Sequence, residues 1–142
     1  MVEKFNLDHI SFFDDEFFVN QKWAVEVEER IGGRFRWWAQ PRAADLLRLD
    51  LKKMEKCGLM VLAPGLETGS NRLLKATRKG ETVEEYREAN RRLAETNIIA
   101  QYNFMVGFPT ETAKERRETV SLGVGLWKGN PKAKVKRGSP LT

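Results

Sequence analysis

The sequence contains little cysteine, little histidine and no long hydrophobic run. One cysteine among 142 residues excludes an intrachain disulfide and a cysteine-rich metal site built by this chain alone. We expect Cys57 to be a small packed side chain, because unpaired cysteines are usually buried. His9 is the single histidine, and its place in a strand-like segment favours a packed or hydrogen-bonded ring. The sequence therefore predicts no metal ligands.

Membrane and secretion signals are also absent. No apolar run approaches the ~18 residues of a membrane span. The opening residues MVEKFNLDHI lack the apolar stretch of a signal peptide. A cytoplasmic location is expected on these grounds.

Positive charge is concentrated at the end of the chain. The net charge is +5, and the last fifteen residues, KGNPKAKVKRGSPLT, hold five lysines or arginines and no acid. Such a segment is either a solvated end or an arm that binds nucleic acid. We expect a poorly ordered basic tail over residues 123–142, and the alternative function is a non-catalytic basic-tail nucleic-acid-binding protein.

Strand-like and helix-like segments alternate along the rest of the chain. The expected strands are 9–13, 35–40, 59–63 and 98–106, and the expected helices are 20–31, 44–57, 70–75, 82–96 and one starting at 112. Thr82 with Glu85 and Thr112 with Glu115 have the spacing of capping boxes, which mark helix starts. Repeated strand-helix units predict an α/β fold with a parallel sheet and crossover helices.

The last expected strand distinguishes a barrel from an open sheet. Gln101 and Asn103 fall on one face, whereas Tyr102 and Phe104 fall on the other. A barrel strand can carry polar groups on its inner face, but a strand covered by helices on both faces cannot. About four strands do not close a barrel. We therefore expect a partial TIM-like (βα) barrel over residues 1–122, with open edges that favour self-association.

Acidic and basic side chains follow the expected strands, at the edge where ligands bind in parallel α/β folds. This rule selects Asp14, Asp15, Glu16, Arg42, Glu67 and residues 107–111. Acids with one arginine suit a ligand that carries an amino group, hydroxyls and a carboxylate. The alternative is that the acids form turns and cap helices.

Four phrases in order resemble the radical SAM barrel. They are ISFFDDEFFVN, RWWAQPRAADLL, MVLAPGLETGSNRLLKATRKGETVEE and YNFMVGFPTET. They look most like the branch whose members often carry a cobalamin-binding domain, and the likeness covers residues 5 to about 120. The resemblance implies an enzyme that binds S-adenosylmethionine as a small-molecule cofactor, with an unknown substrate.

The resemblance implies roles for particular residues. Asp14, Asp15 and Glu16 stand where the family holds the amino group of S-adenosylmethionine, and a carboxylate suits an ammonium group. Glu67 matches a polar position near the ribose or methionine. Arg42 matches an arginine that would pair with a substrate carboxylate or with Glu67.

A further set matches the adenine-contacting strand of the family. Asn103, Met105 and Gly107 occupy it, and Gly107 would allow close approach of the backbone. The first position is usually glycine in the family and is Asn103 here, which is a departure from the pattern.

The cluster motif of the family is missing. Radical SAM enzymes hold a [4Fe-4S] cluster through a CxxxCxxC loop, and this sequence has none. The implied parent would cleave S-adenosylmethionine reductively and start radical chemistry, with cobalamin-dependent methyl transfer or cyclisation as options. The chain is therefore expected to be a fragment that is inactive by itself.

Overall fold

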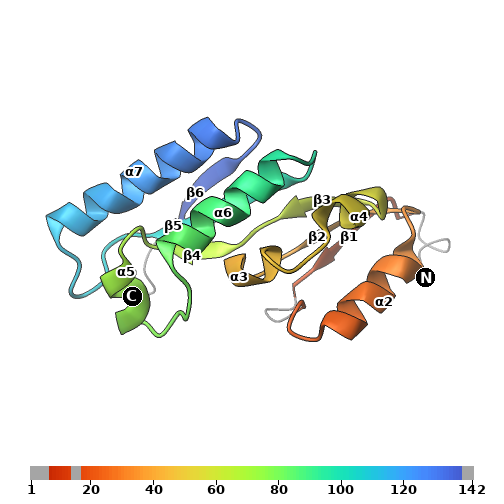
Figure 1. Cartoon of the computed structure of the whole chain (residues 1–142), viewed down its shortest axis with the longest axis horizontal. Coiled ribbons are helices and arrows are strands. Elements are labelled where there is room, and N and C mark those ends of the chain that lie inside the picture. The colour runs from red at the N-terminus through yellow and green to blue at the C-terminus, as the bar shows by residue number, and fades with distance from the viewer. Residues whose placement is uncertain (1–6, 14–16, 139–142) are drawn as a thin grey trace.

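The fold is a six-stranded parallel sheet with helices between its strands. The computed structural model describes residues 7–13 and 17–138. In chain order the elements are β1 (His9–Phe12), α2 (Gln21–Ile31), β2 (Arg36–Ala39), α3 (Ala43–Leu46), α4 (Leu51–Lys56), β3 (Leu59–Leu62), β4 (Gly65–Glu67), α5 (Asn71–Ala76), α6 (Val83–Ala94), β5 (Ile99–Met105), α7 (Ala113–Gly129) and β6 (Lys134–Gly138) (Figure 1).

The strands follow one another across the sheet in chain order. β1 pairs with β2, β2 with β3, and β5 with β6, and every pair is parallel. β3 and β4 both pair with β5, through Val61–Ile99 and Gly65–Asn103, so they are successive parts of one interrupted strand. A doubly wound sheet would reverse its order at a switch point. The unreversed order is that of a (βα) barrel wall, and the expected fold class is confirmed.

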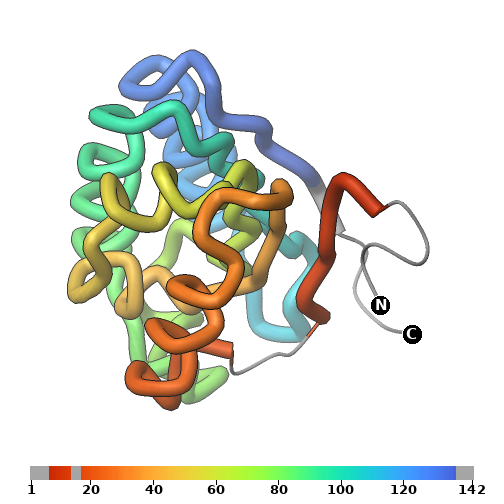
Figure 2. The backbone as a smooth tube through the Cα atoms, turned by 90° about the vertical axis from the view of Figure 1, so that its right-hand side faces the viewer, coloured from red at the N-terminus to blue at the C-terminus, as the bar shows by residue number. Residues whose placement is uncertain are grey.

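The two faces of the sheet have different environments. Burial alternates residue by residue along β5: Tyr102 and Phe104 are buried, whereas Gln101 and Asn103 are only half-buried. The helices gather over the buried face (Figures 1 and 2). The polar side chains of β5 therefore lie on the inner face, as the alternation in the sequence predicts.

An aromatic cluster fills the core beneath α2. Trp37 is 1% exposed, and its ring packs at centroid distances of 5.9 Å from Phe12 and 5.8 Å from Phe17. Its indole nitrogen donates a hydrogen bond to the carbonyl of Cys57 at 3.0 Å. The neighbouring Trp38 is half-buried and its ring meets Phe13 at 5.1 Å. The two tryptophans thus lie on opposite faces of β2, as expected.

Side chains at the helix starts fix several boundaries. Thr82 with Glu85 and Thr112 with Glu115 both form the predicted capping boxes. The side chain of Asn20 caps α2 by accepting from the Trp23 amide at 3.1 Å. These local signals explain why the sequence predicts the starts of α2, α6 and α7 correctly.

Two expected elements are divided differently in the structure. The single helix expected over residues 44–57 is two helices, because Asp50 caps a new start at α4. The guanidinium of Arg92 donates to the carbonyls of Leu46 and Leu49 in the break between them. The loop expected at 65–69 begins instead with the short strand β4.

Residues 123–138, which the sequence suggests are part of a poorly ordered tail over residues 123–142, contain regular elements. α7 continues to Gly129, and β6 then pairs with β5 from Gln101–Lys134 to Met105–Gly138. Gly123 of α7 lies against this strand, and a Cβ there would be in ordinary contact with the Val135 side chain at 3.4 Å. β1 and β6 each pair with one neighbour among the described strands, so each leaves one edge unpaired. Within the same residues no helix is long and apolar enough to cross a membrane.

Candidate functional site

The carboxyl ends of the strands bring the expected site residues to one rim of the sheet. Glu67 ends β4, Arg42 is the residue before α3, and Gly107 follows β5. Asn103 and Met105 lie on the half-buried inner face of β5, below this rim. The expected acids at positions 14–16 lie outside the described residues.

Four charged side chains form what we call the rim charge cluster: Arg42, Glu67, Lys79 and Glu81. The Lys79 ammonium donates to Glu67 Oε1 at 3.2 Å and lies 3.9 Å from Glu81 Oε2. Glu81 Oε1 accepts from the Ala44 amide at 2.9 Å and lies 3.9 Å from Arg42 Nε. Of the two partners considered for Arg42, a substrate carboxylate or Glu67, the second is not the one it meets here, because Arg42 pairs with Glu81 and donates to the Lys79 carbonyl.

The backbone of Glu67 is in a conformation that non-glycine residues rarely adopt. Its φ is 63°, in the left-handed region that concentrates at functional sites and tight turns. Its Oε1 lies 2.8 Å from the position that a Cβ on Gly65 would occupy. Gly65 therefore provides the space in which the Glu67 carboxylate folds back over β4 toward Lys79.

The loop after Glu67 is fixed to the side of α7. The hydroxyl of Thr119 accepts from the Gly69 amide at 2.9 Å and meets the Thr68 hydroxyl at 3.1 Å. Thr68 and Thr119 are 0% and 3% exposed. Gly69 is required at this contact, because a Cβ there would lie 2.7 Å from the Glu118 carbonyl oxygen.

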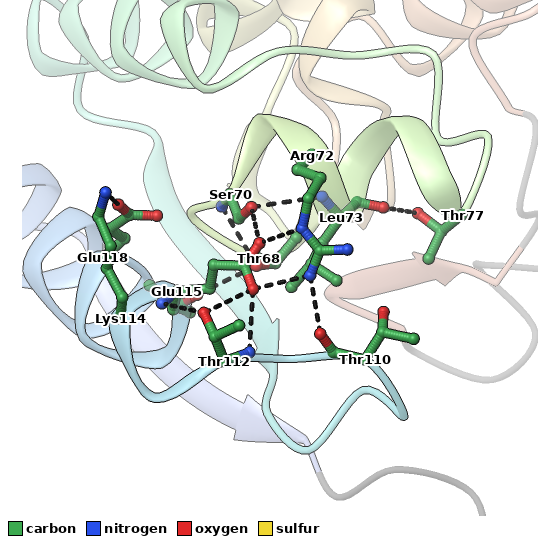
Figure 3. A network of polar contacts seen from close by, with 11 residues as sticks. Thr68, Ser70, Arg72, Leu73, Thr77, Thr110, Thr112, Lys114, Glu115 and Glu118 are labelled. Atoms are coloured by element: carbon green, nitrogen blue, oxygen red, sulfur yellow. Dashed lines mark hydrogen bonds and ion pairs between the residues drawn. The ribbon is translucent and has the colours of Figure 1, made fainter.

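Glu115 links the two loops that form this part of the rim (Figure 3). Its carboxylate accepts from Nε and Nη2 of Arg72 at 2.7 and 2.8 Å and from the Ser70 hydroxyl at 2.8 Å. It also accepts from the amide and hydroxyl of Thr112 at 2.9 and 2.8 Å. Arg72 donates in addition to the Thr110 carbonyl at 2.8 Å. The β4–α5 loop and the β5–α7 loop are thus held together by one carboxylate.

This network makes a prediction about pH. The hydrogen bonds from Arg72, followed by those from Thr112 and Ser70, hold the pKa of the Glu115 carboxyl well below its ordinary value of 4.5. A lowered folded-state pKa stabilises the fold above the unfolded-state value, and that contribution is lost as the pH falls. We expect Glu115→Gln to be less stable than the wild type at pH 7, with a difference that shrinks below about pH 4. Urea unfolding of both proteins at pH 7, 5 and 3 measures the difference in the free energy of unfolding. A difference that stays the same at all three pH values would contradict the prediction.

The turn after β5 is stabilised by a second buried acid. Gly107 has a φ of 93°, and its amide donates to Glu111 Oε2 at 2.8 Å. Arg116 Nε donates to the same oxygen at 3.3 Å. Glu111 Oε1 is buried with no hydrogen-bond partner among the described residues. An open hollow of about 450 Å³ lies beside this turn, lined by Val106, Gly107, Arg116 and Val120.

The described residues do not form a site for an iron-sulfur cluster. No group of three or more metal-ligating side chains occurs among them. Cys57 directly follows α4 and precedes β3, at the amino ends of the strands and opposite the rim. Burial, followed by the nearby Glu28 carboxylate, raises the pKa of its thiol, which disfavours the thiolate that binds metal. Cys57 is only half-buried, so the fully buried side chain that the sequence suggests is not what the structure shows.

The sequence predicts some of the residues at this candidate site but not others. It identified Arg42, Glu67 and Gly107, because each follows an expected strand. It missed Lys79 and Glu81, which come from the loop between α5 and α6. The separation of Lys79 and Glu81 from Glu67 in the sequence follows no helix or strand periodicity. Their proximity to Glu67 is therefore visible only in the folded structure.

Comparison with protein families gives one match across most of the chain. Residues 1–123 match the family model described as the radical SAM superfamily. Among curated proteins, the chain is 29% identical over 126 residues to an uncharacterised methyltransferase of Pyrococcus horikoshii, covering 87% of this chain and 28% of that protein. It is 31% identical over 132 residues to an anaerobic magnesium-protoporphyrin IX monomethyl ester cyclase of Cereibacter sphaeroides, covering 85% and 22%. The chain thus spans about a quarter of the length of these relatives.

A solved structure shares the fold. It is the radical S-adenosylmethionine methyltransferase TsrM of Kitasatospora setae, with cobalamin and a [4Fe-4S] cluster bound. The TM-score is 0.77 at 19% sequence identity, and the match covers 96% of this chain and 27% of TsrM. The likeness shows that this chain and a part of TsrM share one fold.

Proposed function

The chain belongs to the radical SAM superfamily, and we propose that it is a section of a catalytic barrel that binds S-adenosylmethionine at its rim. The observation that carries this proposal is the position of Glu67. It ends β4 at the carboxyl edge of a parallel sheet, with a left-handed backbone and its loop fixed to α7. Ligands bind at this edge in (βα) barrels.

The rim chemistry is suited to the cofactor. S-adenosylmethionine carries an ammonium group and two ribose hydroxyls, all of which donate hydrogen bonds, and an ionised carboxylate is an acceptor only. We assign Asp14, Asp15 and Glu16, which follow β1 in the sequence, to the ammonium group of the cofactor. We assign Glu67 to a ribose hydroxyl or to the methionine part. Arg42, the cation at the start of α3, would stay close to Glu81 and receive a carboxylate of the cofactor or substrate.

The inner strand β5 would receive the adenine. Asn103 and Met105 are half-buried on its inner face, and the positive φ of Gly107 turns the chain at its end. Asn103 replaces the usual glycine with an amide that both donates and accepts hydrogen bonds. We therefore propose a polar contact to the base at Asn103 in place of close backbone approach.

The radical step needs groups that these residues do not supply. One cysteine does not fit a [4Fe-4S] cluster, which requires several thiolates. The proposed parent protein would supply them and cleave S-adenosylmethionine reductively, and the chain alone would be inactive. The methyltransferase and cyclase names of the relatives and the cobalamin in TsrM support methyl transfer or cyclisation as the parent's reaction.

Titration of the chain with S-adenosylmethionine tests the proposed site. Asp14→Asn/Asp15→Asn and Glu67→Gln should each weaken binding at least about tenfold, since one charge-assisted hydrogen bond contributes about 1.5–3 kcal/mol. Glu26→Gln, on the exposed surface of α2, is the matched control and should bind as the wild type. Ligand-observed NMR detects affinities down to the millimolar range. Undetectable binding to the wild type would overturn the proposal, and unchanged affinity in a site variant would remove that residue from the site.

A further inference from the structure

The rim charge cluster contains one acceptor that it does not use. The Glu81 side chain is fully buried, and its Oε1 is already bonded to the Ala44 amide. Its Oε2 has no hydrogen-bond partner among the described residues. A buried carboxylate oxygen without a partner is unfavourable unless a charge lies near it. The Lys79 ammonium, 3.9 Å from that oxygen, provides this charge but donates elsewhere.

Lys79 is placed between two carboxylates. Its ammonium is 3.2 Å from Glu67 Oε1 and 3.9 Å from Glu81 Oε2, and its side chain is 23% exposed. An ammonium has three donors on a flexible four-carbon stem. A small shift along the line to Glu81 would thus complete the second hydrogen bond.

The backbone around Lys79 is held while its side chain remains able to move. The Lys79 carbonyl accepts a hydrogen bond from the Arg42 guanidinium. Gly80, with a φ of 69°, allows this approach, because a Cβ there would lie 3.3 Å from Arg42 Nη2. Arg42 therefore fixes the main chain of Lys79, and only the Lys79 ammonium is free to move between Glu67 and Glu81.

We propose that Lys79 is a positioning residue that exchanges partners when the cofactor binds. Before binding it holds the Glu67 carboxylate over Gly65. When Glu67 turns to accept hydrogen bonds from the bound cofactor, the ammonium moves to Glu81 Oε2. This inference rests on the proposed function, since it takes Glu67 as a cofactor contact.

Partner exchange places the ammonium on the more deeply buried of the two acids. Moving Lys79 from Glu67 to Glu81 completes a hydrogen bond to the fully buried Glu81 carboxylate and leaves Glu67, whose side chain is 24% exposed, to the hydrogen-bond donors of the cofactor. A buried carboxylate left alone would be strongly unfavourable. Glu81 thus lowers the cost of releasing Glu67, and we expect cofactor affinity to depend on a residue that does not touch the cofactor.

The test is a double-mutant cycle in the full chain, measured by calorimetric titration with S-adenosylmethionine. Glu81→Gln should weaken binding about tenfold, because the ammonium then leaves Glu67 with no second carboxylate to receive it, and the glutamine side chain keeps a carbonyl to accept from the Ala44 amide. Lys79→Met should not weaken binding, because no ammonium then has to leave Glu67. The double variant should bind like Lys79→Met, because the loss in Glu81→Gln requires Lys79. Lys75→Met, at an exposed lysine of α5, is the control and should bind as the wild type. Urea unfolding of each variant confirms that the fold is retained.

A spectroscopic measurement distinguishes a positioning role of Lys79 from a purely structural role in stabilising the loop. The carboxyl ¹³C signal of Glu81 should shift when S-adenosylmethionine is added to the wild type and should not shift in Lys79→Met. A loss in Glu81→Gln that persists when Lys79 is also replaced, or a Glu81 signal unaffected by the cofactor, would overturn the exchange and leave the binding site intact. A wild-type chain that does not bind the cofactor would overturn the proposed function itself, and this inference with it.

Discussion

Replacing Trp37 with alanine is expected to lower the free energy of unfolding by about 3–5 kcal/mol, the usual effect of removing a fully buried aromatic side chain. The indole is 1% exposed and packs against Phe12 and Phe17. The substitution also leaves the Cys57 carbonyl without the donor that now lies 3.0 Å away. Domains of this size are stable by about 5–15 kcal/mol in total, so the variant should lose much of its stability.

Urea unfolding followed by circular dichroism measures this loss. Trp127→Ala is the matched control, because Trp127 is 53% exposed on α7, and its change should stay within about 0.5 kcal/mol. Equal losses at the two positions would mean that the aromatic cluster under α2 is not the core of the fold.

Gly69→Ala is expected to damage both stability and cofactor binding. The new Cβ would lie 2.7 Å from the Glu118 carbonyl oxygen and 2.7 Å from the Thr119 Cα. Both are main-chain atoms of α7, so the loop must move away and lose the 2.9 Å bond from the Gly69 amide to Thr119. Overpacking of this kind destabilises by about 1–3 kcal/mol. Because Glu67 is two residues earlier in the same loop, affinity for S-adenosylmethionine should also fall at least about tenfold.

Gly125→Ala provides the control for this substitution. Gly125 lies within α7, and a Cβ there would meet only Arg87 Nη1 at 3.7 Å. Alanine is favoured over glycine inside a helix by up to about 1 kcal/mol, so this variant should be as stable as the wild type or more stable. A Gly69→Ala chain with unchanged stability and affinity would show that the loop does not depend on close contact with α7.

The sequence predicts the parts of the fold that have a local physical signal. The alternation of β5 indicates its two faces, and the capping boxes of α6 and α7 indicate their first turns. Polar residues after strands indicate the rim, because parallel strands end at one edge of the sheet. Each of these patterns involves residues that are close together in the sequence, and it can therefore be recognised without the structure.

The remaining features depend on contacts between distant segments. β6 carries Lys134 and Lys136 on either side of Val135, a pattern that looks like a solvated tail until it pairs with β5. The unexpected break between α3 and α4 is bridged by Arg92, 46 residues from Leu46 in the sequence. Lys79 meets Glu67 across a helix and a loop. Such partners leave no periodic pattern in the sequence.

The central claim is that S-adenosylmethionine binds at the rim formed by β4, β5 and their loops. Chemical-shift mapping of the ¹⁵N-labelled chain during titration with S-adenosylmethionine tests it most directly. The amide signals of residues 65–70 and 107–112 should move together with one dissociation constant, whereas those of residues 21–31 in α2 should stay in place. Shifts confined to α2 or to the outer surface of α7, or no shifts at millimolar cofactor, would contradict it.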